Sequence, residues 1–152
     1  MNSEWSIRRA TESDLEALVS FNRAIARETE HKELREEVVR RGVLRGMQQG
    51  DEAIYFVAES DGKAIGCLMV TREWSDWRDG WLAWIQSVYV SVDFRGQGVF
   101  RGLLENAIDE LRRNPDVIGV RLYVEMENQR AQAVYARTGF ADPRYKVLER
   151  IF

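Results

Sequence analysis

The sequence is poor in the residues that build disulfide frameworks and most metal centres. Its 152 residues include a single cysteine, Cys67, and a single histidine, His31. One cysteine excludes an intrachain disulfide and the cysteine clusters that hold structural zinc or iron–sulfur centres. One histidine excludes metal sites built on several histidines. We therefore expect no metal centre.

Basic excess and long apolar runs are also lacking. Lys and Arg number 22 against 25 Asp and Glu, a net charge of −3, whereas binders of nucleic acid usually carry a basic excess. No stretch approaches the roughly 18 apolar residues of a membrane span, and residues 1–5 lack the regions of a signal peptide. We expect a cytoplasmic protein with neither a nucleic-acid nor a membrane partner.

Only two prolines interrupt the chain, and no linker or internal repeat divides it. Hydrophobic periodicity predicts helices over about 13–27, 34–49, 99–113 and 129–138, and strands over about 5–10, 53–59, 64–73, 81–92 and 117–126. One or two last strands are expected within 140–152. The order β-α-α-β-β-β-α-β-α-β-β predicts one domain over 1–152, of α/β (or α+β) class, with helices on both faces of one mixed sheet.

A glycine-rich turn follows the long strand. The segment 88–104, VYVSVDFRGQGVFRGLL, sets Gly96 and Gly98 between that strand and a helix start. Glycines let the backbone turn its N–H groups toward one point, and a helix N-terminus adds about half a positive charge. Such a turn suits a phosphate or pyrophosphate, with Arg95 and Arg101 as cationic neighbours. Tight packing of strand against helix is the alternative explanation.

A second informative segment, residues 122–140, follows the next strand. Asn128 is well placed to cap the helix that begins after it, and Tyr135 lies on the apolar face of that helix. Taken singly, a capping asparagine and a core tyrosine explain both residues.

Together, the two segments resemble the GNAT superfamily (Gcn5-related N-acetyltransferases), and the whole chain fits that family's element order. The resemblance is carried by Arg95-Gly96-Gln97-Gly98 and by the spaced residues Asn128, Ala131, Tyr135, Gly139 and Phe140. It implies that acetyl-CoA lies in a gap between two splayed parallel strands, 81–92 and 117–126. The residues it implies for cofactor binding are Val88, Tyr89, Val90, Arg95, Gly96, Gln97, Gly98, Val99, Phe100, Arg101, Asn128 and Tyr135.

The resemblance further implies direct attack of an amine on the thioester. Tyr135 would protonate the departing thiolate, since a phenol has a pKa near ~10 and a thiol one near ~8.5. The amide of Val88 would polarise the carbonyl oxygen. No covalent intermediate is needed, so Cys67 is expected to pack within its strand.

Two positions depart from the family pattern. Phe100 stands where the loop often ends in Gly or Ala, and its side chain points away from the pyrophosphate or crowds it. Gln86 stands where many members carry the glutamate that takes the amine's proton, which a glutamine cannot do. Glu125 is the expected base, and the alternatives are Glu127, Glu73, Asp93, a water chain or an acceptor that arrives neutral.

The acceptor site is expected among aromatic and acidic residues. Four of the five tryptophans fall within 74–84, and an aromatic wall near acidic residues would suit a cationic amine. A packed hairpin or a homodimer contact is the alternative. The charged residues between the first two helices border the acceptor site in many family members, although a solvated surface explains them more simply. The expected substrate-binding residues are Trp74, Trp77, Trp84, Gln86, Glu28 and His31.

These features favour an acetyl-CoA-dependent N-acetyltransferase that acts on a primary amine of a small molecule or peptide. The alternative is a GNAT-like module that holds acyl-CoA as a sensor or scaffold without turnover. A third hypothesis is an unrelated nucleotide-binding protein that uses the same anion-binding turn.

Overall fold

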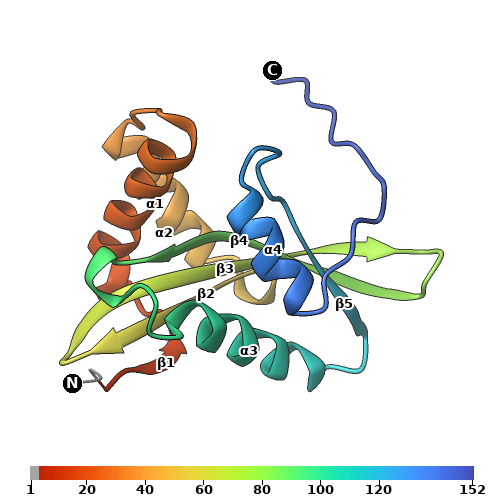
Figure 1. Ribbon diagram of the computed structural model, residues 1–152, viewed down its shortest axis with the longest axis horizontal. Helices are drawn as coiled ribbons and strands as arrows, with labels where there is room; N and C mark the ends of the chain where they lie inside the picture. The colour runs from red at the N-terminus through yellow and green to blue at the C-terminus, as the bar shows by residue number, and fades with distance from the viewer. Residues whose placement is uncertain (1–3) are drawn as a thin grey trace.

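Five strands form one mixed sheet in the computed structural model, which describes residues 4–152 (Figure 1). They lie in the order β1-β2-β3-β4-β5. The first four pair antiparallel, and β5 pairs parallel to β4, so the expected mixed sheet is confirmed. The strands are β1 (Ser6–Arg9), β2 (Ala53–Ser60), β3 (Lys63–Ser75), β4 (Gly80–Val90) and β5 (Val117–Leu122).

Within residues 4–152, four α-helices accompany this sheet, and helices lie on both of its faces. They are α1 (Leu15–Glu30), α2 (Glu36–Met47), α3 (Val99–Arg112) and α4 (Gln129–Arg137). Helices α1 and α2 lie side by side over one face, and α3 lies along the other (Figure 1). No helix in residues 4–152 is long and apolar enough to cross a membrane.

Two hydrophobic cores follow from the alternation of side chains along the strands. On β2, Phe56 packs toward α3, while its neighbour Val57 packs toward α1 and α2. Leu103 and Leu104 supply the apolar stripe of α3 and are almost fully buried. Cys67 lies in the other core and is 1% exposed, so its expected packing within a strand is confirmed.

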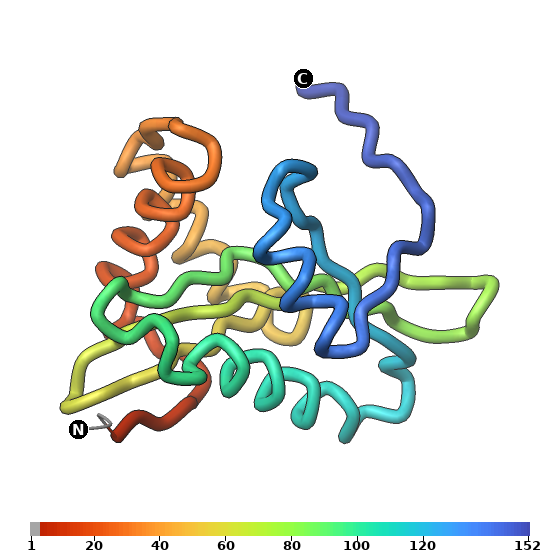
Figure 2. Tube along the Cα trace, in the orientation of Figure 1, coloured from red at the N-terminus to blue at the C-terminus, as the bar shows by residue number. Residues whose placement is uncertain are grey.

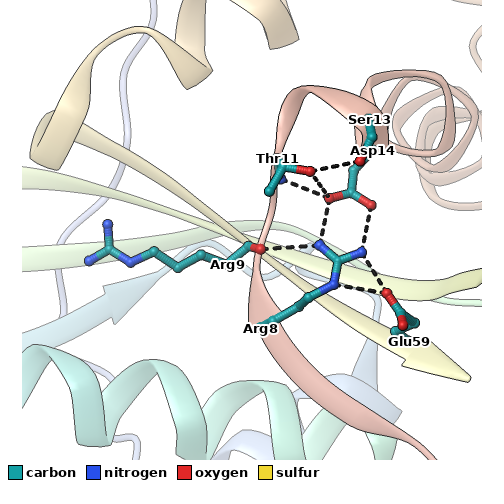
Figure 3. Close-up of polar contacts among 6 residues, drawn as sticks. All are labelled: Arg8, Arg9, Thr11, Ser13, Asp14 and Glu59. Carbon is teal, nitrogen blue, oxygen red and sulfur yellow. Dashed lines mark hydrogen bonds and ion pairs between the residues drawn. The ribbon is translucent and has the colours of Figure 1, made fainter. Parts of the chain in front are cut away.

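A charged cluster fixes the entry into α1 (Figure 3). The guanidinium of Arg8 donates to Asp14 on one side, at 2.8 Å, and to Glu59 on β2 on the other, at 2.6 Å. The buried carboxylate of Asp14 also accepts the N–H of Thr11, at 2.8 Å. A 3-10 turn, Glu12–Asp14, therefore precedes the helix, which begins at Leu15.

The segment after α4 differs from expectation. One or two strands were expected within 140–152, but the structure has no strand between residue 138 and residue 152. Instead the chain runs out from the body of the molecule in an extended form (Figures 1 and 2). A strand needs a neighbour for its backbone groups, and this segment meets none in the structure.

Candidate active site

Strand β4 is paired on both sides for only part of its length. Its pairing with β5 ends at Ile85–Leu122, although β4 continues to Val90 beside β3. A bulge follows at once: Met69 pairs with Gln86, but Cys67 pairs with Tyr89, so β4 carries one extra residue. The bulge bends the strand. A gap therefore opens between the second half of β4 and the exit of β5.

Backbone groups of β4 face this gap. The N–H of Ser91 donates to Ile65 on β3, at 2.8 Å, so the groups of Val90 point to the opposite edge. The Val90 carbonyl there accepts the Nε–H of Arg95, at 2.8 Å. Val88, two residues earlier, presents its backbone groups to the same edge. These are the groups that an extended ligand could pair with.

The glycine-rich turn stands at the end of that edge. Gly96 and Gly98 have φ angles of +76° and +80°, in the left-handed region that favours glycine. A Cβ atom at either position would meet nothing within 4 Å, so the turn is open on its outer side. Gly98 is the N-cap of α3 and no side chain bonds the amides of the first turn. These amides are available to an anion.

The polar side chains in and beside the turn form hydrogen bonds with nearby residues. Arg95 donates to Glu28 of α1 at 2.9 Å and lies over the ring of Tyr89. Arg101 donates to Glu105 at 2.7 Å. Gln97 donates to the carbonyl of Asp93 at 2.9 Å. Glu28, expected at the acceptor site, thus lies beside the glycine-rich turn.

Phe100 packs against Tyr135. The two rings meet edge to face with centroids 5.7 Å apart, and the ring of Phe140 also meets Tyr135 edge to face, with centroids 5.6 Å apart. The side chain of Phe100 therefore belongs to the contact between α3 and α4. Val99, its neighbour, is buried in the core. Burial raises the pKa of the Tyr135 phenol above its ordinary value.

The loop between β5 and α4 is braced by its own polar groups. Asn128 caps α4: its Oδ1 accepts the N–H of Ala131 at 3.1 Å, which leaves the side-chain NH2 to donate elsewhere. The side chain of Gln132 donates to the carbonyls of Glu125 and Met126. The carboxylate of Glu125 is exposed and accepts the N–H of Glu127 at 2.8 Å.

The tryptophans do not form one wall. Trp74 and Trp81 meet edge to face at 5.0 Å. Trp84 lies on the opposite face of β4, where its Nε1 donates to Glu73 at 2.8 Å and its ring meets Tyr123 at 4.5 Å. Trp77 is 87% exposed in the turn between β3 and β4. Only Trp84 shares its face of the sheet with Gln86.

Gln86 lies next to a groove under α2. Its Nε2 donates to Thr71 on β3 at 2.6 Å, and Thr71 and Met69 line a groove of about 590 Å³. Arg41 and Arg45 of α2 line the opposite wall. His31, expected in this region, is the exposed residue after α1.

The two arginines of this groove were not among the expected site residues. They lie one turn apart on α2, and neither forms an ion pair within residues 4–152, whereas Arg23, Arg27 and Arg40 all do. The signal in the sequence was their spacing of four, which places both side chains on one face of a helix.

An anion-binding turn beside a splayed pair of parallel strands is what the resemblance implies for an acyl-CoA-binding fold. The family model of the acetyltransferase (GNAT) family matches residues 15–140. The chain belongs to this family.

Individual proteins agree with this assignment. The chain is 28% identical over 139 residues to an uncharacterised N-acetyltransferase of Methanocaldococcus jannaschii; the match covers 91% of this chain but 61% of that protein's length. It resembles a possible acetyltransferase from Clostridium difficile with a TM-score of 0.90 and 36% identity over 97% of each chain. The crystal structure of a predicted acetyltransferase from Clostridium acetobutylicum with acetyl-CoA shares the fold: the TM-score is 0.79, at 18% identity over 96% of each chain.

Proposed function

We propose that this domain is an acetyl-CoA-dependent N-acetyltransferase that acts on a primary amine of a small molecule or peptide, with Tyr135 as general acid. One observation carries the proposal: the open glycine turn and the half-buried phenol are joined through a single ring, that of Phe100. The turn would hold a phosphate, and the phenol, which lies one helix away, would donate a proton to the leaving group. Use of acetyl-CoA is general in the family.

The residues of the gap suit the chemistry of acetyl-CoA. The pyrophosphate would be held by the amides of residues 96–101, which have no side-chain cap. The amide groups of the pantetheine arm would pair with the backbone of Val88 and Val90, much as an added strand does. The free NH2 of Asn128 would donate to the same arm. When bound, acetyl-CoA supplies an activated acetyl thioester.

Tyr135 would provide the proton for the leaving group. A phenol with an ordinary pKa near ~10 is protonated at neutral pH, and burial, which raises the pKa of Tyr135, keeps it so. Its O–H can therefore be donated to a thiolate. The N–H of Val88, on the open edge of β4, would donate to the carbonyl oxygen as charge develops there.

Removal of the amine's proton falls to a group other than Gln86. The Gln86 side chain donates to Thr71, so its carbonyl oxygen is left to accept a hydrogen bond from the amine and orient it. Glu125 would take the proton at its exposed carboxylate. Glu73 is a weaker candidate, since its carboxylate already accepts from Trp84 and Arg121.

The groove beneath α2 would receive the acceptor. It leads to Thr71 and Gln86, and its lining carries Arg41, Arg45 and one carboxylate, Glu52. The excess of positive charge favours amines that also carry a carboxylate or phosphate group. A second cationic group on the acceptor is not favoured, because the tryptophans do not form the aromatic wall that such a group would use.

A module that binds acyl-CoA without turnover is the second candidate. The bond from Gln86 to Thr71 favours it, because the position from which a glutamate would act as base carries a neutral amide. Retention of Tyr135 in a half-buried site favours the enzyme.

The first experiment is a calorimetric titration of the purified protein with acetyl-CoA and, separately, with ATP. We expect micromolar binding of acetyl-CoA and none of ATP. Absence of acetyl-CoA binding would contradict both candidates, and equal binding of ATP would favour a general nucleotide site.

A screen of amines then separates the two candidates. Released CoA can be followed with a thiol reagent, because Cys67 is buried and its pKa is raised to about 12. CoA release that depends on an amine supports the enzyme. Binding without release for every amine class supports the module.

A further inference from the structure

A row of three side chains crosses the sheet beneath α2. Tyr55 of β2 lies opposite Met69 of β3, and Met69 lies opposite Gln86 of β4. Tyr55 and Met69 pack in the core under α1 and α2, and Gln86 bonds Thr71 on the same face. Neighbouring strands lie about 4.8 Å apart, so the row spans roughly 10 Å from Tyr55 to Gln86. Met69, at its centre, lines the groove under α2.

The hydroxyl of Tyr55 lies beside this groove. Tyr55 is 7% exposed, yet its hydroxyl forms no hydrogen bond within residues 4–152. A Cβ atom on Gly46, which lines the groove, would lie 2.8 Å from the Tyr55 Oη. The lack of a side chain at Gly46 therefore leaves the phenol its place at the groove wall. Buried hydroxyls usually have a partner, so this O–H is available to an oxygen of a ligand.

Gly42, one turn earlier on α2, has no such packing role. It also lines the groove, but a Cβ atom there would meet nothing within 4 Å, and the backbone is helical. A helix interior disfavours glycine relative to alanine, because glycine loses more backbone entropy. The fold therefore does not require a glycine at this position. Its effect is to widen the groove.

The two ends of the row differ in chemistry. Arg45 precedes Gly46, the neighbour of the Tyr55 hydroxyl, and both residues line the groove. A guanidinium and a phenol O–H are both donors, so this end suits the oxygens of a carboxylate or phosphate. At the other end, the Gln86 carbonyl oxygen can accept a hydrogen bond from an amine.

We propose that the acceptor lies along this row, with its amine at Gln86 and its acid group at Tyr55 and Arg45, and that Gly42 makes room for a wide, planar body between them. The inference rests on the proposed function, which assigns the groove to the acceptor. It narrows the acceptor to primary amines that a ring separates from a carboxylate or phosphate. Tyr55 is then a substrate-binding residue, and Gly42 sets the width of the substrate.

Three small amines test the contact with Tyr55. 4-(Aminomethyl)benzoate carries the amine, the ring and the carboxylate, benzylamine lacks the carboxylate, and 6-aminohexanoate has a narrow chain in place of the ring. Each is titrated by calorimetry in the presence of CoA, which has no acetyl group to transfer. We expect 4-(aminomethyl)benzoate to bind most tightly. Tyr55→Phe should weaken its binding about 10- to 150-fold, the equivalent of one hydrogen bond to a charged group, and leave benzylamine unchanged.

Substitutions at Gly42 test the width of the groove. Gly42→Leu should weaken the binding of 4-(aminomethyl)benzoate at least about 10-fold, as a misplaced methyl group does in a fitted pocket, and that of 6-aminohexanoate much less. Gly42→Ala should show the same difference in smaller degree and raise the midpoint of thermal unfolding. Gln48→Leu adds the larger side chain at the exposed end of α2, outside the groove, and should change neither affinity.

The outcomes separate this inference from the proposed function. If CoA and acetyl-CoA do not bind, the proposed function fails, and the three amines are titrated without CoA, so the groove is tested in either case. The inference is overturned if benzylamine or 6-aminohexanoate binds as tightly as 4-(aminomethyl)benzoate, or if none of the three binds. It is also overturned if Tyr55→Phe binds all three as the unmodified protein does, or if the Gly42 variants weaken the wide and the narrow acid equally. Binding of acetyl-CoA in these cases would leave the proposed function intact.

Discussion

The rings of Phe100 and Tyr135 meet edge to face, with centroids 5.7 Å apart, so a residue at the start of α3, next to the glycine-rich turn, also holds the proposed general acid. An aromatic pair of this kind contributes about 0.5–1.5 kcal/mol beyond its buried area. Phe100→Leu keeps the apolar volume but loses the pair.

For Phe100→Leu we expect kcat to fall about 2- to 10-fold, the rate equivalent of that pair energy. The affinity for acetyl-CoA should be unchanged, because the ring lies between α3 and α4 rather than over the turn. Titration calorimetry and steady-state kinetics on the same protein provide the measurement. A large loss of acetyl-CoA affinity would contradict this position of the ring.

Tyr135→Phe removes the proposed acid and keeps the ring. Turnover should fall about 10²- to 10⁴-fold, the usual contribution of a general acid. Binding of acetyl-CoA should persist, because the turn and Asn128 are untouched. A rate equal to that of the unmodified protein would remove Tyr135 from the mechanism.

Arg45→Gln tests the charge of the acceptor. Charged hydrogen bonds contribute roughly 1.5–3 kcal/mol, so KM for an amine with a carboxylate or phosphate group should rise about 10- to 150-fold. KM for the matched neutral amine should not change. Arg23→Gln is the control, since Arg23 is paired with Glu36 and does not line the groove. If the unmodified protein preferred polyamines to amines that carry a carboxylate or a phosphate group, this acceptor class would be contradicted.

The pair of Arg8 and Asp14 makes stability depend on pH. Burial alone would raise the pKa of Asp14, but the hydrogen bonds from Arg8 and from the N–H of Thr11 outweigh it and lower the folded-state pKa. The stabilisation is therefore present above the unfolded-state pKa of aspartate and is lost as pH falls through the lowered folded-state value.

Asp14→Asn should reduce the free energy of unfolding at neutral pH by about 1.5–3 kcal/mol, the contribution of charged hydrogen bonds. The difference from the unmodified protein should shrink as the solution is made acidic. Urea unfolding at neutral and at strongly acidic pH measures it. A difference that does not vary with pH would show that the charge of Asp14 contributes nothing.

The elements of the sheet and their order could be predicted because each strand of the core carries its own apolar pattern. The segment Trp81–Ile85, for example, is apolar at every position and is covered on both faces. The segment 140–152 has a strand pattern too, but pairing depends on a neighbour that the local sequence does not specify. Its expected strands therefore have no counterpart in the structure of the single chain.

The site was harder to predict than the fold, because the direction of a side chain depends on its position in the strand and on its neighbours. Trp81 and Trp84 are three apart, an odd number, so a regular strand sends them to opposite faces. The four tryptophans within 74–84 predicted one aromatic surface, but the alternation of side chains along a strand divides them between two faces. Arg41 and Arg45 escaped prediction for another reason: whether a surface arginine is paired depends on glutamates on other elements, as Arg40 with Glu16 illustrates.

The bulge in β4 has a consequence for how this fold tolerates change. Ser87, with a φ of +52°, lies at the bulge, where β4 carries one residue more than the opposite strand requires. With that residue removed, Gln86 and Tyr89 would lie two positions apart and face the same side as in a regular strand. The pairing of β4 with β5 could then run on past Ile85 and close the gap. The extra residue of β4 thus maintains the opening between β4 and β5. Deleting it would make the sheet more regular and the protein less able to hold a ligand.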